Sequence, residues 1–289
     1  MPEVPEVILQ NSMFQIKTKV IKNIEVAPKC YKIGLFCPRL AKKVVPGQFV
    51  MLRVNSGPEV LLRRPFSIHA VSGKNIEILY EAVGKATEVL SRKKAGEYLD
   101  AIGPLGNGFS VLGSRLSVLV AGGMGIAPLF FLAQALAKRK SKILPNRQAG
   151  QNPNSLVLIG ARTKRQILCE KEFRNLGYEV KIATDDGSKG FKGKVTGLLN
   201  NLLSTMNYQP STIYACGPKL MLKEITRISK KYNIPAQISL EEHMACGIGA
   251  CLGCVVKTQS AKRKAQNAFE YKRVCKDGPV FNANKIIWQ

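Results

Sequence analysis

The stretch VAGGMGIAPL, Val120–Leu129, is the clearest indication of how the middle of the chain folds. An apolar, strand-like run leads into it, glycines then make a turn, and Pro128 suits the first turn of a helix. Strand, glycine turn and helix in this order are typical of a dinucleotide-binding loop, because glycines let backbone N–H groups approach phosphates closely. The pattern is GGxGxxP rather than GxGxxG. We expect the nucleotide to contact Gly122, Gly123 and Gly125.

Strand and helix signals alternate on both sides of this loop, across residues 114–236. Such alternation predicts a doubly wound parallel sheet. The uncharged run Leu116–Ala137 is long enough to cross a membrane. Glycines and Pro128 interrupt the run, so we expect a buried strand followed by a helix and no membrane span.

A second nucleotide contact is predicted where the strand-like run Thr212–Ala215 ends, at Cys216, Gly217 and Pro218. Ligands of open α/β sheets lie at the carboxyl ends of the strands, where a small thiol can touch a nicotinamide edge. The alternative for Cys216 is an ordinary buried cysteine. The basic stretch GARTKR, Gly160–Arg165, follows another predicted strand and would suit a 2′-phosphate, which leaves NAD and NADP both open.

Residues 12–113 carry short alternating apolar runs separated by Pro, Gly, Asn and Lys, a pattern typical of a small antiparallel barrel. The motif RRPFSI, Arg63–Ile68, is its main candidate for flavin binding. Arg64 offers a charged fork to a pyrophosphate, Phe66 an aromatic face, and Ser67 a hydroxyl for the flavin N5. The alternative is a plain strand with an exposed arginine.

Two further stretches of the barrel region extend this interpretation. In LYEAVGKAT, Leu79–Thr87, a strand runs into a glycine turn whose backbone N–H groups would suit flavin phosphates. Taken alone, the stretch is better interpreted as an ordinary strand, turn and helix. In GPLGNGF, Gly103–Phe109, glycines and a proline mark a loop between two domains, where flavin and nicotinamide are expected to meet.

Four cysteines near the C-terminus predict an iron–sulfur cluster. Cys246, Cys251 and Cys254 have the C-x4-C-x2-C spacing of plant-type ferredoxins, and Cys275 follows twenty residues later. The small residues between them let backbone N–H groups approach sulfur. Structural zinc is the main alternative, although its cysteines usually occur as C-x2-C pairs. The first ten residues lack a signal-peptide pattern, and eight cysteines then indicate a reducing compartment, so we expect a cytoplasmic protein.

The net charge of +25 is large, but the basic residues are dispersed and no aromatic residues are interleaved with them. We interpret the charge as a solvated surface, with an acidic redox partner as the second explanation and nucleic acid as a distant third. We expect no nucleic-acid partner. Two polar stretches, Ser141–Asn154 and Lys257–Lys272, are predicted to be surface loops. Three domains are expected: residues 12–113, 114–236 and 237–289.

Taken together, the chain resembles the electron-transfer subunits of dihydroorotate dehydrogenase B, within the ferredoxin–NADP reductase superfamily. The resemblance covers residues 12 to 289. It rests on LLRRPFSI, GPLGNGF, the GGMGIAP loop, ATDDGS, CGPKLM, SLEEHMACGIGACLGC and VCKDGPVF. The last two are the most specific, because other members of the superfamily space their cluster cysteines differently.

The resemblance implies a flavin-binding barrel, an NAD-binding α/β domain and a C-terminal ferredoxin-like [2Fe–2S] segment. It implies FAD, one cluster and NAD, and an FMN-containing catalytic subunit as partner in a heterotetramer of pyrimidine biosynthesis. Electrons would run from dihydroorotate to FMN, through the cluster to FAD, and then to NAD. The cluster ligands would be the four cysteines. The matching flavin positions are Arg64, Pro65, Phe66, Ser67, Leu79, Tyr80, Glu81, Ala86 and Thr87.

Two positions depart from the family pattern, which usually has arginine at Glu81 and glycine at Ala86. Glu81 would repel a flavin phosphate. The stretch EAVGKAT is instead similar to flavoprotein subunits of NADH-dependent ferredoxin:NADP oxidoreductases, which usually replace one cluster cysteine by aspartate. Two rival functions stay open: an NAD(P)H reductase subunit for a ferredoxin or other redox partner, and a basic zinc-containing binding protein. We expect no acid–base catalytic residue, because the cofactors carry the chemistry.

Overall fold

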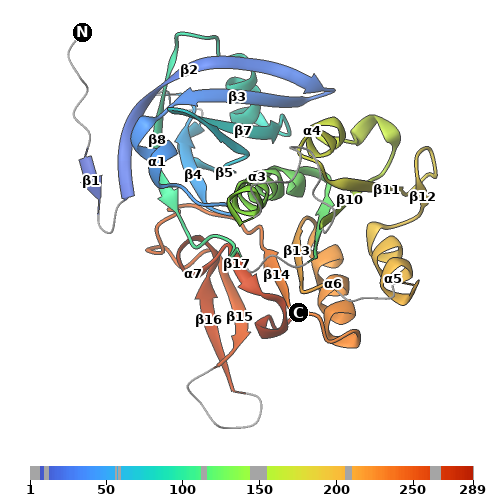
Figure 1. Ribbon diagram of the computed structural model, residues 1–289. Coiled ribbons are helices and arrows are strands. Elements are labelled where there is room, and N and C mark those ends of the chain that lie inside the picture. Colours follow the sequence, from blue (N-terminus) through green and yellow to red (C-terminus); the bar gives the residue numbers. More distant parts are fainter. Residues whose placement is uncertain are drawn as a thin grey trace.

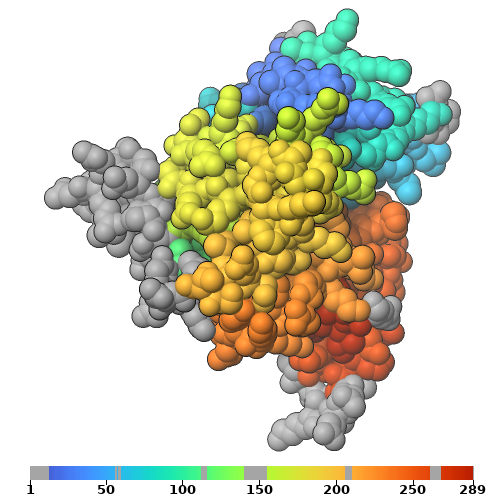
Figure 2. Space-filling view, turned by 90° about the vertical axis from the view of Figure 1, so that its right-hand side faces the viewer, coloured from blue at the N-terminus to red at the C-terminus, as the bar shows by residue number. Residues whose placement is uncertain are grey.

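Figure 1 shows the computed structural model of the chain. The structure describes residues 7–9, 13–55, 57, 60–111, 116–143, 155–205, 210–260 and 268–288. An antiparallel sheet precedes a parallel sheet with helices on both faces, and the cysteine-bearing segment lies beneath them. Figure 2 shows the three parts packed into one continuous body. One core cluster includes Met51 of the first part, Val118 of the second and Cys275 of the third. The parts therefore share a core.

The first sheet is antiparallel and strongly bent, with the strand order β5-β4-β8-β2-β3-β7-β6 and β1 beside β2. Its inward side chains include Ile33, Leu35, Ile76 and Ile78, which are fully buried. This is the alternation that predicted a barrel. The strands are β1 (Val7–Leu9), β2 (Met13–Ala27), β3 (Cys30–Phe36), β4 (Phe49–Arg53), β5 (Arg64–Ser67), β6 (Ala70–Ser72), β7 (Asn75–Glu81) and β8 (Tyr98–Leu105).

Two short helices accompany this sheet. Helix α1 (Pro38–Lys43) begins with a proline, whose fixed φ suits the first turn, and buries Leu40. Helix α2 (Lys85–Ser91) follows the glycine turn after β7 and buries Ala86 and Leu90.

The second sheet has the order β12-β11-β10-β9-β13-β14-β17. All its pairings are parallel except that between β14 and β17, which confirms the predicted doubly wound sheet. The chain starts at β9, moves outward to β12, and then returns to the other side of β9 with β13. The strands are β9 (Ser117–Gly122), β10 (Ser155–Ala161), β11 (Glu179–Thr184), β12 (Phe191–Lys192), β13 (Thr212–Cys216), β14 (Ala236–Ser239) and β17 (Val280–Asn282).

Helices cover both faces of this sheet. Val118 and Val120 of β9 face the core shared with α5 and α6, whereas Leu119 and Ala121 face the core shared with α3 and α4. This two-sided burial explains why the strand is apolar throughout. The helices are α3 (Ile126–Ile143), α4 (Glu170–Asn175), α5 (Val195–Thr205) and α6 (Lys219–Lys231). Within the described residues, none of the helices has the length and apolarity that spanning a membrane requires.

The C-terminal segment leaves the second sheet and then rejoins it. β14 crosses the expected domain boundary at residues 236/237, and β17 adds an antiparallel strand beside it. Between them lie the cysteine loops, the hairpin of β15 (Val255–Gln259) and β16 (Phe269–Arg273), and the one-turn helix α7 (Val274–Asp277). The expectation that Lys257–Lys272 is a loop is therefore wrong at both ends, because alternating Val, Thr, Phe and Tyr pair as strands. The middle of that stretch and residues 144–154 lie outside the described residues.

Candidate functional site

The glycine loop lies at the carboxyl end of β9, the switch point of the doubly wound sheet. Gly122 ends the strand, a single 3-10 turn spans Gly123–Gly125, and α3 follows at once. Gly123 has a φ of +53°, which favours glycine, and a Cβ there would meet no atom within 4 Å. At a switch point the backbone is open to a ligand. The loop thus has the position and the backbone freedom that a dinucleotide requires.

The structure brings this loop against the second predicted nucleotide motif. A Cβ on Gly125 would overlap the Cys216 carbonyl, and one on Gly122 would lie 2.6 Å from the Met221 Sδ. Two of the glycines are therefore required for packing against residues 216–221. Cys216 itself is buried, and burial, followed by the nearby Glu241 carboxylate, raises the pKa of its thiol. The thiol is neutral and offers a small, uncharged contact.

The flavin motif occupies β5, and its two arginines have different surroundings. The Arg63 guanidinium forms an ion pair with Asp100 at 2.5 Å and also donates to the Asp100 carbonyl. Arg64 Nη1 donates to the Leu62 carbonyl at 2.9 Å, and its side chain stays partly exposed. Of the two arginines, Arg63 is engaged by Asp100, whereas the Arg64 guanidinium has no carboxylate partner among the contacts seen between described residues.

The aromatic member of the motif is mostly covered by the barrel. Phe66 is 8% exposed and meets the Tyr80 ring edge-on, with 5.8 Å between the ring centroids. Tyr80 stacks on Tyr31 and donates to Asn23 Oδ1 at 3.1 Å. Pro65 and Ser67 remain partly exposed, so a flavin would find the edge of this strand rather than a free aromatic face.

The second predicted flavin stretch is buried at some positions and accessible at others. Leu79 and Ala86 lie in the core, while Glu81 is exposed at the end of β7. Thr87 Oγ1 accepts hydrogen bonds from the backbone N–H groups of Val83 and Gly84, at 2.9 and 3.1 Å. Thr87 therefore fixes the turn before α2.

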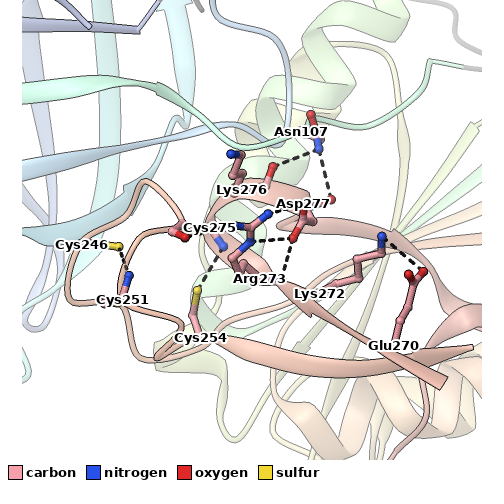
Figure 3. A network of polar contacts seen from close by, with 11 residues as sticks. Asn107, Cys246, Cys251, Cys254, Glu270, Lys272, Arg273, Cys275, Lys276 and Asp277 are labelled. Atoms are coloured by element: carbon pink, nitrogen blue, oxygen red, sulfur yellow. Dashed lines mark hydrogen bonds and ion pairs between the residues drawn. The ribbon is translucent and has the colours of Figure 1, made fainter. Parts of the chain in front are cut away.

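The four cysteines form two pairs (Figure 3). The Cys251 N–H donates to Cys246 Sγ, and the Cys275 N–H donates to Cys254 Sγ, both at 3.4 Å. Among the described residues, no three His, Cys, Asp or Glu side chains gather closely enough to hold one metal ion. A [2Fe–2S] cluster requires two pairs of cysteines rather than one group, because two thiolates bind each of its two irons.

The two pairs differ in their access to solvent. Cys254 and Cys275 are buried, and burial, followed by the neighbouring Cys254 sulfur, raises the pKa of the Cys275 thiol to about 12. Cys251 is exposed and Cys246 half-buried. Although burial opposes it, hydrogen bonds led by the Cys251 N–H lower the pKa of Cys246 to about 6. Backbone donors turned toward sulfur are what cluster thiolates need, so the loop fits the group.

One residue that contacts the cysteine-bearing segment, Asn107, was not identified as a site residue from the sequence. Asn107, in the GPLGNGF loop, donates from Nδ2 to the carbonyls of Lys276 and Asp277, at 3.2 and 3.1 Å. Its backbone N–H donates to the Gly278 carbonyl. The loop therefore docks on the segment that carries Cys275, which its glycines alone did not indicate.

The cysteine loop also contacts the barrel strand next to the flavin motif. Met51 of β4 pairs with Pro65 of β5, and a Cβ on Gly247 would lie 2.8 Å from the Met51 Sδ. Met51 is fully buried. The loop that bears Cys246 thus lies one strand away from the flavin motif.

Comparison with known proteins agrees with this arrangement. Residues 119–227 match a family model for the oxidoreductase NAD-binding domain. Residues 241–287 match the iron-sulfur cluster binding domain of dihydroorotate dehydrogenase B.

Two curated relatives are dihydroorotate dehydrogenase B (NAD(+)) electron transfer subunits. The one from Desulforamulus reducens is 41% identical, over 94% of this chain and 97% of the relative. The one from Caldanaerobacter subterraneus subsp. tengcongensis is 38% identical, over 95% and 99%.

Solved structures share the fold. A chain of the NADH-dependent reduced ferredoxin-NADP oxidoreductase superimposes with a TM-score of 0.76 at 30% identity, covering 94% of this chain and 90% of that chain. The ferredoxin reductase of carbazole 1,9a-dioxygenase gives a TM-score of 0.63 at 19% identity, covering 79% and 68%. The near-full-length identity to the curated relatives decides the assignment: the chain belongs to the family of dihydroorotate dehydrogenase B electron transfer subunits.

Proposed function

We propose that this chain is the electron-transfer subunit of a dihydroorotate dehydrogenase of pyrimidine biosynthesis and binds FAD, NAD and one [2Fe–2S] cluster. The observation that carries the proposal is the contact of Met51 with both Pro65 and Gly247. It supports the proposal because the cysteine loop lies beside the strand that carries the RRPFSI motif. The glycine loop is held against Cys216, at the switch point of the adjoining sheet.

When bound, FAD exchanges a hydride with the nicotinamide and single electrons with the iron–sulfur centre. The chain itself binds and orients. Arg64 would supply positive charge for the FAD pyrophosphate. Ser67 and Thr87 would present their hydroxyl groups to FAD at the exposed edge of the barrel. The glycine loop receives the dinucleotide phosphates, and the neutral Cys216 thiol packs beside the nicotinamide. The proposed cluster ligands are Cys246, Cys251, Cys254 and Cys275.

The proposed partner is an FMN-containing catalytic subunit that oxidises dihydroorotate, joined to this chain in a heterotetramer. Cys251 is the exposed ligand, and its neighbours Ile248 and Leu252 are 43% and 59% exposed. An exposed apolar rim around a redox group suits a protein partner. We place the complex in the cytoplasm, because cysteines used as cluster ligands rather than in disulfides are typical of a reducing compartment.

An absorption spectrum of anaerobically purified protein, before and after NADH, tests this function. We expect FAD, about two irons per chain and bleaching of both chromophores by NADH. Zinc without flavin would overturn the proposal in favour of a structural zinc protein. Equal reduction rates with NADPH would overturn the choice of NAD.

A second candidate is a reductase subunit for a ferredoxin. The 30% identical chain of the ferredoxin-NADP oxidoreductase, with its TM-score of 0.76, favours it. The four cysteines and the higher identity to the curated relatives favour the first function. Mixing the reduced subunit with an FMN-containing dihydroorotate dehydrogenase subunit or with a ferredoxin, and following reoxidation, separates the two.

A further inference from the structure

Arg273 joins the two halves of the cysteine site (Figure 3). Its Nη1 donates to the Gly249 carbonyl at 3.2 Å, within the loop between Cys246 and Cys251. Its Nε and Nη2 donate to the two carboxylate oxygens of Asp277, at 3.1 and 3.4 Å. Asp277 ends the helix that carries Cys275. One guanidinium thus connects the exposed pair of cysteines to the buried pair.

The two elements that Arg273 connects are a one-turn helix and a glycine-containing loop. Helix α7 has four residues, less than the length at which helices become stable alone. Asp277 Oδ2 accepts the Arg273 N–H at 2.8 Å and closes this turn. On the other side, Gly249 has a φ of +84°, and a Cβ there would lie 2.7 Å from Lys276 Cδ. The loop therefore lies directly against α7, and the hydrogen bonds of Arg273 connect the two.

The charge of Arg273 matters as well as its shape. The guanidinium is permanently charged, and it lies between the Asp277 carboxylate and the Gly249 carbonyl. Its side chain is 30% exposed, so water screens it incompletely. A nearby positive charge favours the reduced, more negative form of an iron–sulfur centre.

We propose that Arg273 is a positioning residue for the cluster: it fixes the Cys246–Cys251 loop against α7 and raises the reduction potential of the bound group. The inference rests on the proposed function, since it requires that the four cysteines hold iron and sulfide. No feature of the NAD or flavin site enters it.

The test compares four variants of the full chain, loaded with cluster and FAD. Arg273→Gln removes both the positive charge and the guanidinium hydrogen-bond donors. Arg273→Lys keeps the charge but loses the planar set of donors. Asp277→Asn removes the carboxylate that orients the guanidinium. Lys272→Gln is the matched control, because it removes one charge from the adjacent residue, whose side chain pairs with the half-buried Glu270 of the hairpin at 3.3 Å. Cluster loss to an iron chelator and the potential from an EPR-monitored titration are measured, with FAD content as the folding control.

We expect Arg273→Gln to lose its cluster about 10-fold faster or more, as supporting residues of metal sites commonly do, and to move the potential to more negative values. Arg273→Lys is expected to lose the cluster faster with little change in potential. Asp277→Asn is expected to lose it faster and to move the potential to more positive values, because a negative charge beside the guanidinium is removed. Lys272→Gln is expected to behave like the wild type. These last three keep the test decisive if Arg273→Gln does not fold.

Wild-type cluster retention and potential in Arg273→Gln would overturn the inference and leave the proposed function intact. Equal changes in Lys272→Gln and Arg273→Gln would also overturn it, because net charge alone would then explain them. A wild-type chain that binds FAD but no iron would instead overturn the proposed function, and the inference with it.

Discussion

Met51 and Gly247 touch across the boundary between the barrel and the cysteine-bearing segment. A Cβ on Gly247 would lie 2.8 Å from the sulfur of Met51, and Met51 pairs through its backbone with Pro65. The close approach requires a residue without a side chain in the loop. It keeps the cysteine loop near the strand that we propose to bind flavin, so it would help to set the distance between flavin and cluster.

Replacing Gly247 by alanine should therefore slow electron transfer between flavin and cluster. The φ of +71° costs about 1 kcal/mol for a residue with a Cβ, and the overlap with Met51 adds to this. Stopped-flow reduction by NADH should show unchanged flavin bleaching followed by slower cluster bleaching. Met51→Leu, which conserves volume, is the control and should retain both rates. Unaltered cluster bleaching in Gly247→Ala would show that this contact does not set the rate.

Replacing Cys251 by serine should remove the cluster while FAD binding and flavin reduction by NADH remain. The reason is that the flavin and nucleotide residues lie on other elements, whereas Cys251 is half of one cysteine pair. Iron, sulfide and FAD analysis checks the outcome. Cys30→Ser, a free cysteine on the barrel strand β3, should keep the wild-type iron content. Loss of NADH-driven flavin reduction with FAD still bound would contradict the proposed order of electron flow.

Replacing Arg64 by glutamine should weaken FAD binding by about 10- to 100-fold, the equivalent of one charged hydrogen-bond partner. Fluorescence titration of the FAD-depleted protein measures this. The matched control is Arg63→Gln, because Arg63 forms an ion pair with Asp100 and is not proposed to bind FAD. We expect it to lower the free energy of unfolding while FAD affinity stays close to wild type. The reverse result would assign the phosphate to Arg63.

Replacing Gly125 by alanine should weaken NADH binding, because the new Cβ overlaps the backbone of Cys216 and Gly217. Overpacking of this kind costs about 1–3 kcal/mol, and the displacement would occur within the nucleotide loop. The NADH concentration that half-saturates flavin reduction should rise about 10-fold or more. Gly197→Ala is the control in the same domain: its Cβ meets only Phe191, at 3.5 Å or beyond, and should gain helix propensity. An NADH affinity of Gly125→Ala equal to that of the wild type would show that the glycine loop does not bind the nucleotide.

His69 should make the protein less stable in mild acid. It is fully buried between the barrel and α3, where its ring stacks on Phe130, and burial, followed by Lys32, lowers its pKa from 6.5 to about 3. Between pH 6.5 and 3, His69 is therefore protonated in the unfolded chain but neutral in the folded chain. Stability falls as pH falls through this window, by up to about 1.4 kcal/mol per pH unit.

Urea unfolding at neutral pH and near pH 5 measures this dependence, and His69→Gln should reduce it. The other histidine supplies the control, because His243 is exposed and His243→Gln should retain the wild-type dependence. An unchanged pH dependence in His69→Gln would assign the acid sensitivity to other groups.

Features that depend on neighbouring residues could be predicted from the sequence. The glycine loop, the strand–helix alternation and the C-x4-C-x2-C spacing are local patterns, and the structure contains the predicted barrel strands, parallel sheet and cysteine loop. Their order along the chain was enough to indicate the family, because each module carries its own spacing of glycines or cysteines.

Contacts between residues far apart in the chain were decided only by tertiary structure. Nothing local marks Asn107 as the partner of the Asp277 carbonyl, or Met51 as the neighbour of Gly247. Tertiary structure also decides that β17 returns to the sheet beside β14. It likewise decides that Arg63 pairs with Asp100 while Arg64 stays partly exposed. Sequence periodicity states which side of an element is buried, whereas which element covers it depends on how the whole chain packs.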